Sequence, residues 1–231
     1  MKYFILAAGE GSRLKDEGIS TPKPLLRVGN ETLIDRHIRL AVTNGFSELC
    51  IIVNDLYPEL KTTITSKSFD IPVHLVVKTT PSSFHSFSEL KHLIDNQPLL
   101  LTTIDPFFPE ARFKDFLSIV KQNPDFDGVM GLTDFVDDEK PLWVKTDDEM
   151  LITDYQSDKT NCKLVSAGFY FFKSNISGMV DQAIEQKIHK MRVFQKMLLD
   201  EGWKLLGCNI GKVIDIDHIT DLENARTMIK E

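Results

Sequence analysis

The stretch Leu6-Ala7-Ala8-Gly9-Glu10-Gly11-Ser12-Arg13-Leu14 places a glycine-rich turn directly after the first apolar run of the chain, Tyr3–Leu6. Glycine lets backbone N–H groups approach a phosphate group without obstruction by side chains. Arg13 and, ten residues later, Lys23 add two cations beside this turn. Arginine can hold phosphate oxygens bidentately, whereas lysine acts as a point charge. The stretch therefore predicts a site for an anionic, phosphorylated ligand.

Two common phosphate-binding motifs are excluded by the spacing. In a dinucleotide-binding GxGxxG motif, the third glycine would fall at Leu14. A Walker A loop needs a glycine followed directly by Lys-Ser or Lys-Thr, and the turn has no such pair. The turn therefore belongs to another kind of nucleotide or phosphate site.

Short apolar runs alternate with stretches of helical periodicity over the first two-thirds of the chain. Several runs are continuously apolar, as in parallel strands that are covered on both faces. Strand–helix–strand repetition predicts an α/β fold of right-handed βαβ units with a mostly parallel sheet. The predicted strands are Tyr3–Leu6, Leu49–Val53, Val73–Val77, Leu99–Ile104 and Gly128–Leu132, and the helical stretches between them include 33–41 and 113–120.

The pattern becomes less regular after Asp134. Acidic residues up to Glu149 bracket a short apolar run, which predicts solvated loops around a hairpin. We expect one domain over 1–231, with a regular first part (1–134), a less regular elaboration (135–212) and a last strand with a closing helix (213–231). The later predicted elements are a strand at Leu164–Phe172, helices at Ile176–Gln186 and Arg192–Leu199, strands around Trp203–Cys208 and Val213–Ile216, and a helix at Thr220–Lys230.

The composition excludes several classes of protein. Hydrophobic residues make up 42% and charged residues 26% of the 231 residues, which is a globular rather than a disordered balance. Lys+Arg 27 against Asp+Glu 34 gives a net charge of −7, the wrong sign for a binder of nucleic acid or of an acidic membrane surface. The three cysteines are far apart and include no CxxC pair, which suits a reducing cytoplasm. We expect a cytoplasmic protein and leave homo-oligomerisation open.

One segment of this acidic chain is locally basic. Residues 11–39 hold six basic side chains against four acidic ones. We expect this segment to attract an anionic substrate. The basic residues are Arg13, Lys15, Lys23, Arg27, Arg36 and Arg39.

The motif Leu6-Ala7-Ala8-Gly9-x-Gly11-Ser12-Arg13, together with Pro22-Lys23-Pro24-Leu25-Leu26, resembles the N-terminal motif of the nucleotidyltransferases that make nucleotide-activated sugars and phosphocholine derivatives. The resemblance extends from Leu6 to Ala225 and implies the nucleotide-diphospho-sugar transferase fold, a Rossmann-like, three-layer α/β/α arrangement with a mixed, mostly parallel sheet. It implies that 1–134 is a nucleotide-binding half, 135–212 an acceptor-binding elaboration and 213–231 a metal strand with a closing helix. It also implies the contacts with a nucleoside triphosphate: base contacts from Leu6, Ala7, Ala8 and Gly9, and phosphate contacts from Gly11, Ser12, Arg13 and Lys23.

Asp105 follows the apolar run Leu99–Ile104. Ligands of open α/β sheets collect at the carboxyl ends of the strands, and a carboxylate there suits Mg²⁺, which prefers oxygen ligands. In the family that the chain resembles, this position carries a metal-binding aspartate. The alternative is that Asp105-Pro106 only forms a turn or cap before the next helix.

Asp215 and Asp217 stand in Val213-Ile214-Asp215-Ile216-Asp217, which resembles a C-terminal segment where the family completes its metal site. Strand alternation places both carboxylates on one side, so either could be the second ligand. The motif alignment favours Asp215, and Asp217 could instead cap the final helix.

Two further regions resemble the family more weakly. Gly168, in the strand Leu164–Phe172, stands where the family's glycine approaches a sugar, and Lys159 is what remains of a Glu-Lys-Pro motif that contacts the acceptor. The segment Thr80–Ser86 replaces a glycine-rich loop that reads the base, and Ser83 could supply a hydrogen bond there.

The resemblance implies Mg²⁺-dependent transfer of a nucleoside monophosphate from a nucleoside triphosphate to a small phosphorylated acceptor, with a sugar 1-phosphate expected first. Arg13 and Lys23 would be the catalytic cations, and no general base is needed because the acceptor is already an anion. One alternative is a cytidylyltransferase for phosphocholine or a polyol phosphate, with Tyr155, Tyr170 or Trp143 against a quaternary ammonium. Others are a glycosyltransferase that uses Asp215-x-Asp217, and a non-catalytic binder of nucleotides or sugar phosphates.

Overall fold

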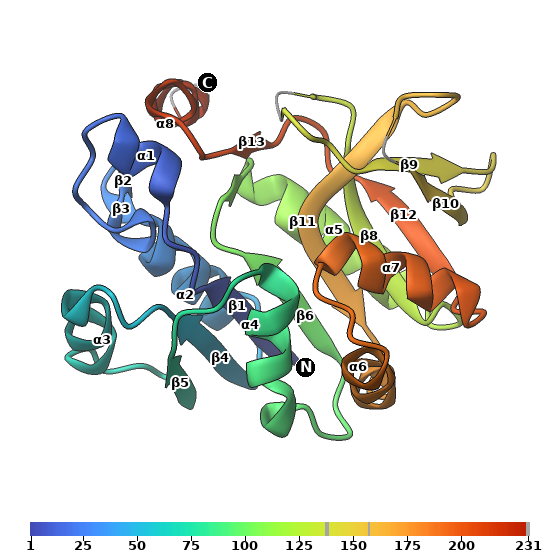
Figure 1. Ribbon diagram of the computed structural model, residues 1–231, viewed down its shortest axis with the longest axis horizontal. Coiled ribbons are helices and arrows are strands. Elements are labelled where there is room, and N and C mark those ends of the chain that lie inside the picture. Colours follow the sequence, from blue (N-terminus) through green and yellow to red (C-terminus); the bar gives the residue numbers. More distant parts are fainter. Residues whose placement is uncertain (137–138, 157, 230–231) are drawn as a thin grey trace.

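The first apolar run of the chain forms strand β1 (Lys2–Ala7), and all six of its residues are buried. In the computed structural model, which describes residues 1–136, 139–156 and 158–229, β1 pairs in parallel with β4 (Glu48–Val53) and with β6 (Leu99–Thr103). A strand with neighbours at both edges and helices over both faces is expected to be apolar throughout. β1 is therefore a central strand of the sheet (Figure 1).

The sheet is mixed, and most of its described strands point the same way. They run in the order β5-β4-β1-β6-β11-β8-β12, and the hairpin β9-β10 is attached to the first residues of β11. Only β11 and β10 oppose the direction of the other described strands. This arrangement confirms the predicted α/β class with a mixed, mostly parallel sheet. The other strands of this sheet are β5 (Val73–Val77), β8 (Gly128–Thr133), β9 (Trp143–Thr146), β10 (Ile152–Gln156), β11 (Leu164–Phe172) and β12 (Leu205–Asn209).

Helices cover both faces of the sheet and bury one apolar core on each (Figure 1). Tyr3 and Ile5 of β1 face the core beneath α2, α3, α5 and α8, whereas Phe4 and Leu6 face the core beneath α4, α6 and α7. The α-helices are α1 (Ser12–Asp16), α2 (Leu33–Thr43), α3 (Pro58–Thr65), α4 (Ser83–Glu89), α5 (Glu110–Gln122), α6 (Ile176–Glu185), α7 (Met191–Asp200) and α8 (Ile219–Met228). Two 3₁₀ helices, η1 (Lys23–Leu25) and η2 (Lys91–Leu93), and the short strands β2 (Arg27–Val28), β3 (Glu31–Thr32), β7 (Pro106–Phe107) and β13 (Ile214–Asp215) complete the elements.

The predicted elements agree with the observed ones, with small shifts of their ends. The acidic segment does contain a hairpin: Asp147, Asp148 and Glu149 lie in the turn between β9 and β10, and β10 is polar enough to have escaped prediction. Residues 137–138 of that segment and the predicted end of the last helix, Lys230, lie outside the described residues. None of the helices that the structure describes is long and apolar enough to cross a bilayer.

The strand order creates a crevice at the carboxyl end of β1. After β1 the chain adds β4 and β5 on one side and then returns to place β6 on the other side. Where strand order reverses in this way, the loops that leave the strands diverge and ligands can bind between them. The glycine-rich turn follows β1, Asn54 follows β4 and Asp105 follows β6, so all of them lie at this edge of the sheet.

Gly168 allows β11 to bend toward β6. The register between β11 and β8 shifts between Ser166 and Tyr170, so the strand carries an irregularity at this point. Gly168 adopts φ +70°, and a Cβ placed on it would lie 2.8 Å from Thr103 Oγ1 and 3.0 Å from Pro106 Cγ. Only glycine combines this backbone conformation with so close an approach.

His37, on α2, is buried against Tyr3 of β1. The Tyr3 hydroxyl lies 2.8 Å from His37 Nδ1, and the histidine is 2% exposed. Burial, reinforced by the nearby charge of Arg36, lowers the pKa of His37 to about 3 from its ordinary 6.5. His37 is therefore neutral in the folded protein at physiological pH.

The free energy of unfolding should fall as the pH drops from about 6.5 toward 3. In this window the unfolded chain protonates His37 and the folded chain does not, so acid favours unfolding by up to about 1.4 kcal/mol per pH unit. Urea unfolding at a series of pH values should show a shallower slope for His37→Gln than for the wild type. Equal slopes would contradict a neutral, buried His37.

Gly168→Ala should lower the free energy of unfolding by about 1–3 kcal/mol, because it combines a left-handed backbone with steric overlap. The matched control is Gly178→Ala in α6, where a Cβ meets nothing within 4 Å. Alanine should stabilise that helix by about 0.5–1 kcal/mol. Chemical denaturation checks both changes, and the same sign at both positions would refute the packing constraint at Gly168.

Candidate active site

A cleft of about 690 Å³ lies at the carboxyl ends of β1 and β6. We call it the β1 cleft, and it is lined by residues 6–14, Lys23, Pro24, 80–83, Ser86, 103–105 and Asp217. Every residue that the sequence predicted for the nucleotide, including Ser83, lines this cleft. The structure thus brings the motif residues together, and their contacts with a nucleotide stay a prediction.

The backbone of the glycine-rich turn is held open toward this cleft. Gly11 has φ +64° and precedes α1 as its N-cap residue, in a left-handed conformation that glycine adopts without strain. The side-chain amide of Asn54, which is 1% exposed, donates a hydrogen bond of 2.8 Å to the Gly9 carbonyl. The turn is therefore anchored to the end of β4 and does not depend on a ligand for its position.

Lys23 joins three distant segments of the chain at the centre of the site. Its ammonium nitrogen lies 2.9 Å from Asp105 Oδ2 and 2.7 Å from Asp217 Oδ1. Arg13 Nη1 donates to the other oxygen of Asp217 at 2.6 Å. The two predicted catalytic cations and two of the three predicted metal ligands thus form one charged cluster.

The charges of this cluster stabilise one another. Burial disfavours the charged form of Lys23, but Asp105, Asp217 and Asp215 outweigh it and raise the pKa of Lys23 above its ordinary 10.5. Burial also works against ionised Asp105, and the charge of Lys23 overcomes it and lowers the pKa of Asp105. At neutral pH the site therefore presents an ammonium and a carboxylate side by side.

A second cavity of about 320 Å³ lies between β11 and α7. We call it the β11 cavity. It shares Ser82, Ser83, Thr103 and Asp105 with the β1 cleft, so Asp105 stands where the two spaces meet. The other lining residues are Leu142, Ser166, Gly168, Tyr170, Lys190, Met191, Arg192, Gln195 and Asp215.

The two C-terminal aspartates share one opening, but each also lines a different one of the two cavities. Asp215 lines the β11 cavity, and Asp217 lines the β1 cleft. β13 ends at Asp215 and pairs with β7 beside Asp105. The capping hypothesis for Asp217 is wrong: His218 is the N-cap of α8 and forms a capping box with Asp221, while the Asp217 carboxylate turns to Lys23 and Arg13.

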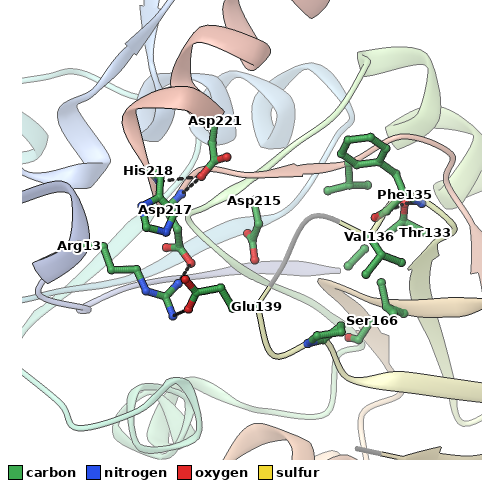
Figure 2. A pocket seen from close by; sticks show the side chains of 14 residues that line it. Arg13, Thr133, Phe135, Val136, Glu139, Ser166, Asp215, Asp217, His218 and Asp221 are labelled. Carbon is green, nitrogen blue, oxygen red and sulfur yellow. Dashed lines mark hydrogen bonds and ion pairs between the residues drawn. The ribbon is translucent and has the colours of Figure 1, made fainter. Parts of the chain in front are cut away.

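Figure 2 shows the opening between β13 and the segment around Glu139. Arg13 extends into it, with Nη1 on Asp217 and Nη2 3.7 Å from Glu139 Oε2. Asp215 points into the same opening from β13. Because the Arg13 side chain is 42% exposed, its guanidinium can exchange these carboxylates for another anion.

Lys159 is not brought to the cavities. It lies on the exposed loop after β10, and its ammonium sits 5.6 Å from the ring centroid of Trp143. Trp143 and Tyr155 are both 8% exposed and lie in the protein interior rather than along the β1 cleft or the β11 cavity. The expected contact of Lys159 with the acceptor therefore finds no support in the geometry, and of the three aromatic candidates only Tyr170 reaches the site.

The locally basic segment 11–39 does not act as a unit. Arg39 pairs with Glu31 and Glu110, and Arg36 lies over the Phe107 ring, 4.5 Å from its centroid. These arginines hold α2 to the start of α5, away from the cleft. Of the six basic residues, Arg13 and Lys23 line the β1 cleft, so the expected attraction of an anionic substrate stays a prediction that rests on these two.

Several residues of the site carry no signal that the motifs could reveal. Tyr170, Lys190, Arg192 and Gln195 reach the β11 cavity only because α7 packs beside β11. Asn54 could have been found, since it follows the apolar run Leu49–Val53 at the same edge of the sheet as Asp105.

The carboxylates present suit Mg²⁺ that is shared with a substrate. The other oxygen of Asp105, Oδ1, is buried and has no hydrogen-bond partner in the described structure. Within residues 1–136, 139–156 and 158–229 no group of three His, Cys, Asp or Glu side chains could hold an ion by itself. Mg²⁺ commonly binds one or two carboxylates and completes its shell with water and substrate phosphates.

The architecture is similar to that of solved nucleotidyltransferases. The inositol-1-phosphate CTP transferase from T. maritima superposes with a TM-score of 0.81 at 17% identity, over all of this chain and 96% of that one. A putative glucose-1-phosphate thymidylyltransferase from Bacillus anthracis gives 0.84 at 16% identity, with the same coverage. At such identities the likeness concerns the fold.

Curated relatives match parts of the sequence. Mannose-1-phosphate guanyltransferases of Kluyveromyces lactis and Gibberella zeae are 27% and 29% identical over 124 and 131 residues, about half of this chain. An N-acetylmuramate alpha-1-phosphate uridylyltransferase of Neisseria meningitidis is 45% identical over 51 residues, 22% of each chain. The aligned part covers about a third of the length of the two guanyltransferases.

The family model described as nucleotidyl transferase matches residues 2–206, from β1 into β12. The match includes the glycine-rich turn, Lys23 and Asp105, on which the sequence resemblance rests. The chain therefore belongs to the nucleotidyl transferase family, as the sequence predicted.

Proposed function

We propose that this protein transfers a nucleoside monophosphate from a nucleoside triphosphate to a small phosphorylated acceptor, most readily a sugar 1-phosphate, and releases pyrophosphate. The junction of the two cavities at Asp105 carries this proposal. A triphosphate along the glycine-rich turn and an acceptor beside Gly168 would meet there. The sugar 1-phosphate names of the mannose, glucose and N-acetylmuramate relatives agree with this acceptor class.

The β1 cleft suits the triphosphate. Its backbone turn offers N–H groups, and Arg13 and Lys23 offer positive charge at one end. In the absence of substrate the two cations are paired with Asp217 and Asp105. Binding of phosphate oxygens replaces or shares these carboxylate contacts, so the cations are already oriented toward the position of the incoming charge.

The reaction needs no general base from the protein. An oxygen of the acceptor phosphate attacks the α-phosphorus, the bond from that phosphorus to the bridging oxygen breaks, and the electron pair leaves with pyrophosphate. Charge therefore moves toward the leaving phosphates, where Arg13 and Lys23 neutralise it. The raised pKa keeps the Lys23 ammonium protonated, so it acts as a fixed charge rather than as an acid.

Asp105 and Asp215 are the residues that would hold Mg²⁺. They flank the junction, and Asp105 has an unpaired buried oxygen there, while Asp217 is engaged by Lys23 and Arg13. A bound Mg²⁺ would supply Lewis-acid neutralisation of the substrate phosphates. The motif alignment favours Asp215 as the second ligand, and Asp215 lines the same cavity as Asp105.

A polyol phosphate is the second candidate acceptor, because the inositol-1-phosphate CTP transferase shares the whole fold. Phosphocholine is less well supported, since Trp143 and Tyr155 lie away from the cavities. Pyrophosphate release, measured across the four nucleoside triphosphates with glucose 1-phosphate, mannose 1-phosphate, inositol 1-phosphate and phosphocholine, tests the proposal. If no combination of triphosphate and acceptor released pyrophosphate, a non-catalytic binder of nucleotides or sugar phosphates would be the better interpretation.

Arg13→Gln should reduce kcat/KM for pyrophosphate release by about 30- to 1000-fold, since one charge-assisted contact in such a site supplies roughly 2–4 kcal/mol. Its melting temperature should stay near that of the wild type, because exposed ion pairs contribute about 0–1 kcal/mol. Lys23→Gln should lose activity similarly and also stability, because it leaves Asp105 without its cation. Normal turnover of Arg13→Gln would remove Arg13 from the mechanism.

Removal of divalent cations with EDTA should abolish pyrophosphate release, and added Mg²⁺ should restore it. Asp105→Asn should remain folded but lose the Mg²⁺-dependent increase in triphosphate affinity, measured by calorimetry with a non-hydrolysable analogue. Asp115→Asn, an exposed change on α5, is the matched control and should bind like the wild type. Full activity in EDTA would show that the carboxylates serve another purpose.

A further inference from the structure

Gln195 is a buried polar side chain in the wall of the β11 cavity. It lies on α7, is 0% exposed, and lines the cavity with Gly168 and Tyr170. Neither its amide nitrogen Nε2 nor its amide oxygen Oε1 has a hydrogen bond of normal geometry in the described structure, although the Tyr170 hydroxyl lies close enough to interact with the amide. Among the described buried side chains, it is the one amide in which both polar atoms lack such a bond.

Such a side chain is unfavourable for folding. Buried amides are nearly always hydrogen-bonded, because an unpaired donor or acceptor forfeits its interactions with water. Its neighbours in the buried face of α7, Phe194 and Leu198, are apolar, and an apolar residue at 195 would fit the same packing. A glutamine at this position is therefore explained better by a ligand than by the stability of the fold.

The surroundings indicate what that ligand offers. Tyr170 and Ser166 line the same cavity, and their hydroxyl oxygens lie 3.2 Å apart. Burial raises the pKa of Tyr170, so its hydroxyl stays protonated. A carboxamide with one donor group and one acceptor, beside two hydroxyls, matches a molecule that carries several hydroxyl groups of its own.

The charges at the rim of the cavity fit a phosphate on the same molecule. Lys190 is the N-cap residue of α7, and Arg192 lies in its first turn; both line the cavity and are exposed. They line the same cavity as Asp105, which lies at the junction with the β1 cleft, so their positive charge favours an acceptor whose phosphate lies at that junction. A quaternary ammonium would satisfy neither amide atom of Gln195, because it has no hydrogen-bonding group.

We propose that Gln195 is a specificity-determining residue of the acceptor site, which selects a polyhydroxylated phosphate by hydrogen bonds from its carboxamide to the acceptor hydroxyls. This inference rests on the proposed function and extends it to the chemistry of the acceptor. The carboxamide donates through Nε2 and accepts through Oε1, so two neighbouring hydroxyl groups can give each of these atoms a hydrogen-bond partner.

The test is Gln195→Met, which keeps the length of the side chain and removes both polar atoms. The best acceptor of the panel and its monodeoxy analogues are compared in wild type and variant. We expect kcat/KM for that acceptor to fall by about 10- to 100-fold, with the KM of the triphosphate unchanged. For one monodeoxy analogue, kcat/KM in the wild type should be lower than for the full acceptor, whereas the variant should use both equally well. The reason is that the missing hydroxyl and the missing amide are hydrogen-bond partners.

Stability provides a separate readout. Because the wild-type amide is unsatisfied, Gln195→Met should melt at the same temperature as the wild type or higher. Gln186→Met, at an exposed position just beyond α6, is the matched control and should leave both stability and acceptor use unchanged. A lower melting temperature for Gln195→Met, together with unchanged discrimination among the analogues, would show that the glutamine is structural and overturn the inference.

The outcomes separate this inference from the proposed reaction. If phosphocholine is the best acceptor, nucleotidyl transfer stands and the role of Gln195 is refuted. If the wild type releases no pyrophosphate with any combination of triphosphate and acceptor, the proposed reaction is wrong. Calorimetric titration with glucose 1-phosphate and inositol 1-phosphate then tests the inference by itself. Binding weakened tenfold or more by Gln195→Met supports it, and equal binding or none overturns it.

Discussion

The ammonium of Lys23 is the contact on which the site depends. It joins the segment after the glycine-rich turn to Asp105 at the end of β6 and to Asp217 before α8, which are 82 and 194 residues away. Without that cation, Asp105 would lose the positive charge that offsets its burial and its repulsion with Asp215 and Asp217. The same pairing keeps Lys23 charged and leaves it facing the space that a triphosphate would occupy. The pairing of Lys23 with Asp105 and Asp217 therefore both stabilises the site and keeps a positive charge in place for an anionic ligand.

The two cavities follow from the direction of β11. This strand runs antiparallel between β6 and β8, and its irregular centre at Gly168 closes on Thr103 and Pro106. The β11 cavity is thus set directly against the end of β6, where Asp105 belongs to both spaces. A reaction between two anions needs such an arrangement, because the reacting phosphates must be held together and their charges neutralised at one point.

Motif and periodicity predicted most of the fold and the nucleotide side of the site. Leu6–Leu14 and Lys23 are close in sequence, so their shared position needed only the strand and its turn. The hydrophobic runs predicted the sheet because parallel strands are apolar on both faces. The acceptor side was predicted poorly: Lys159 lies at Trp143, and Gln195 has no motif that would distinguish it from a surface glutamine.

By itself the sequence determined the fold class, the family and the residues along the β1 cleft, since these depend on local spacing and on the sheet's strand pattern. Tertiary structure alone decided that Asp217 pairs with Lys23 and Arg13 while Asp215 faces the β11 cavity. It also decided that Arg36 and Arg39 turn away and that Gln195 is buried beside Tyr170 without a hydrogen bond of normal geometry. The physical reason is that side-chain pairing across 80 to 200 residues depends on how helices and strands pack, and the periodicity of one segment carries no information about its distant neighbours.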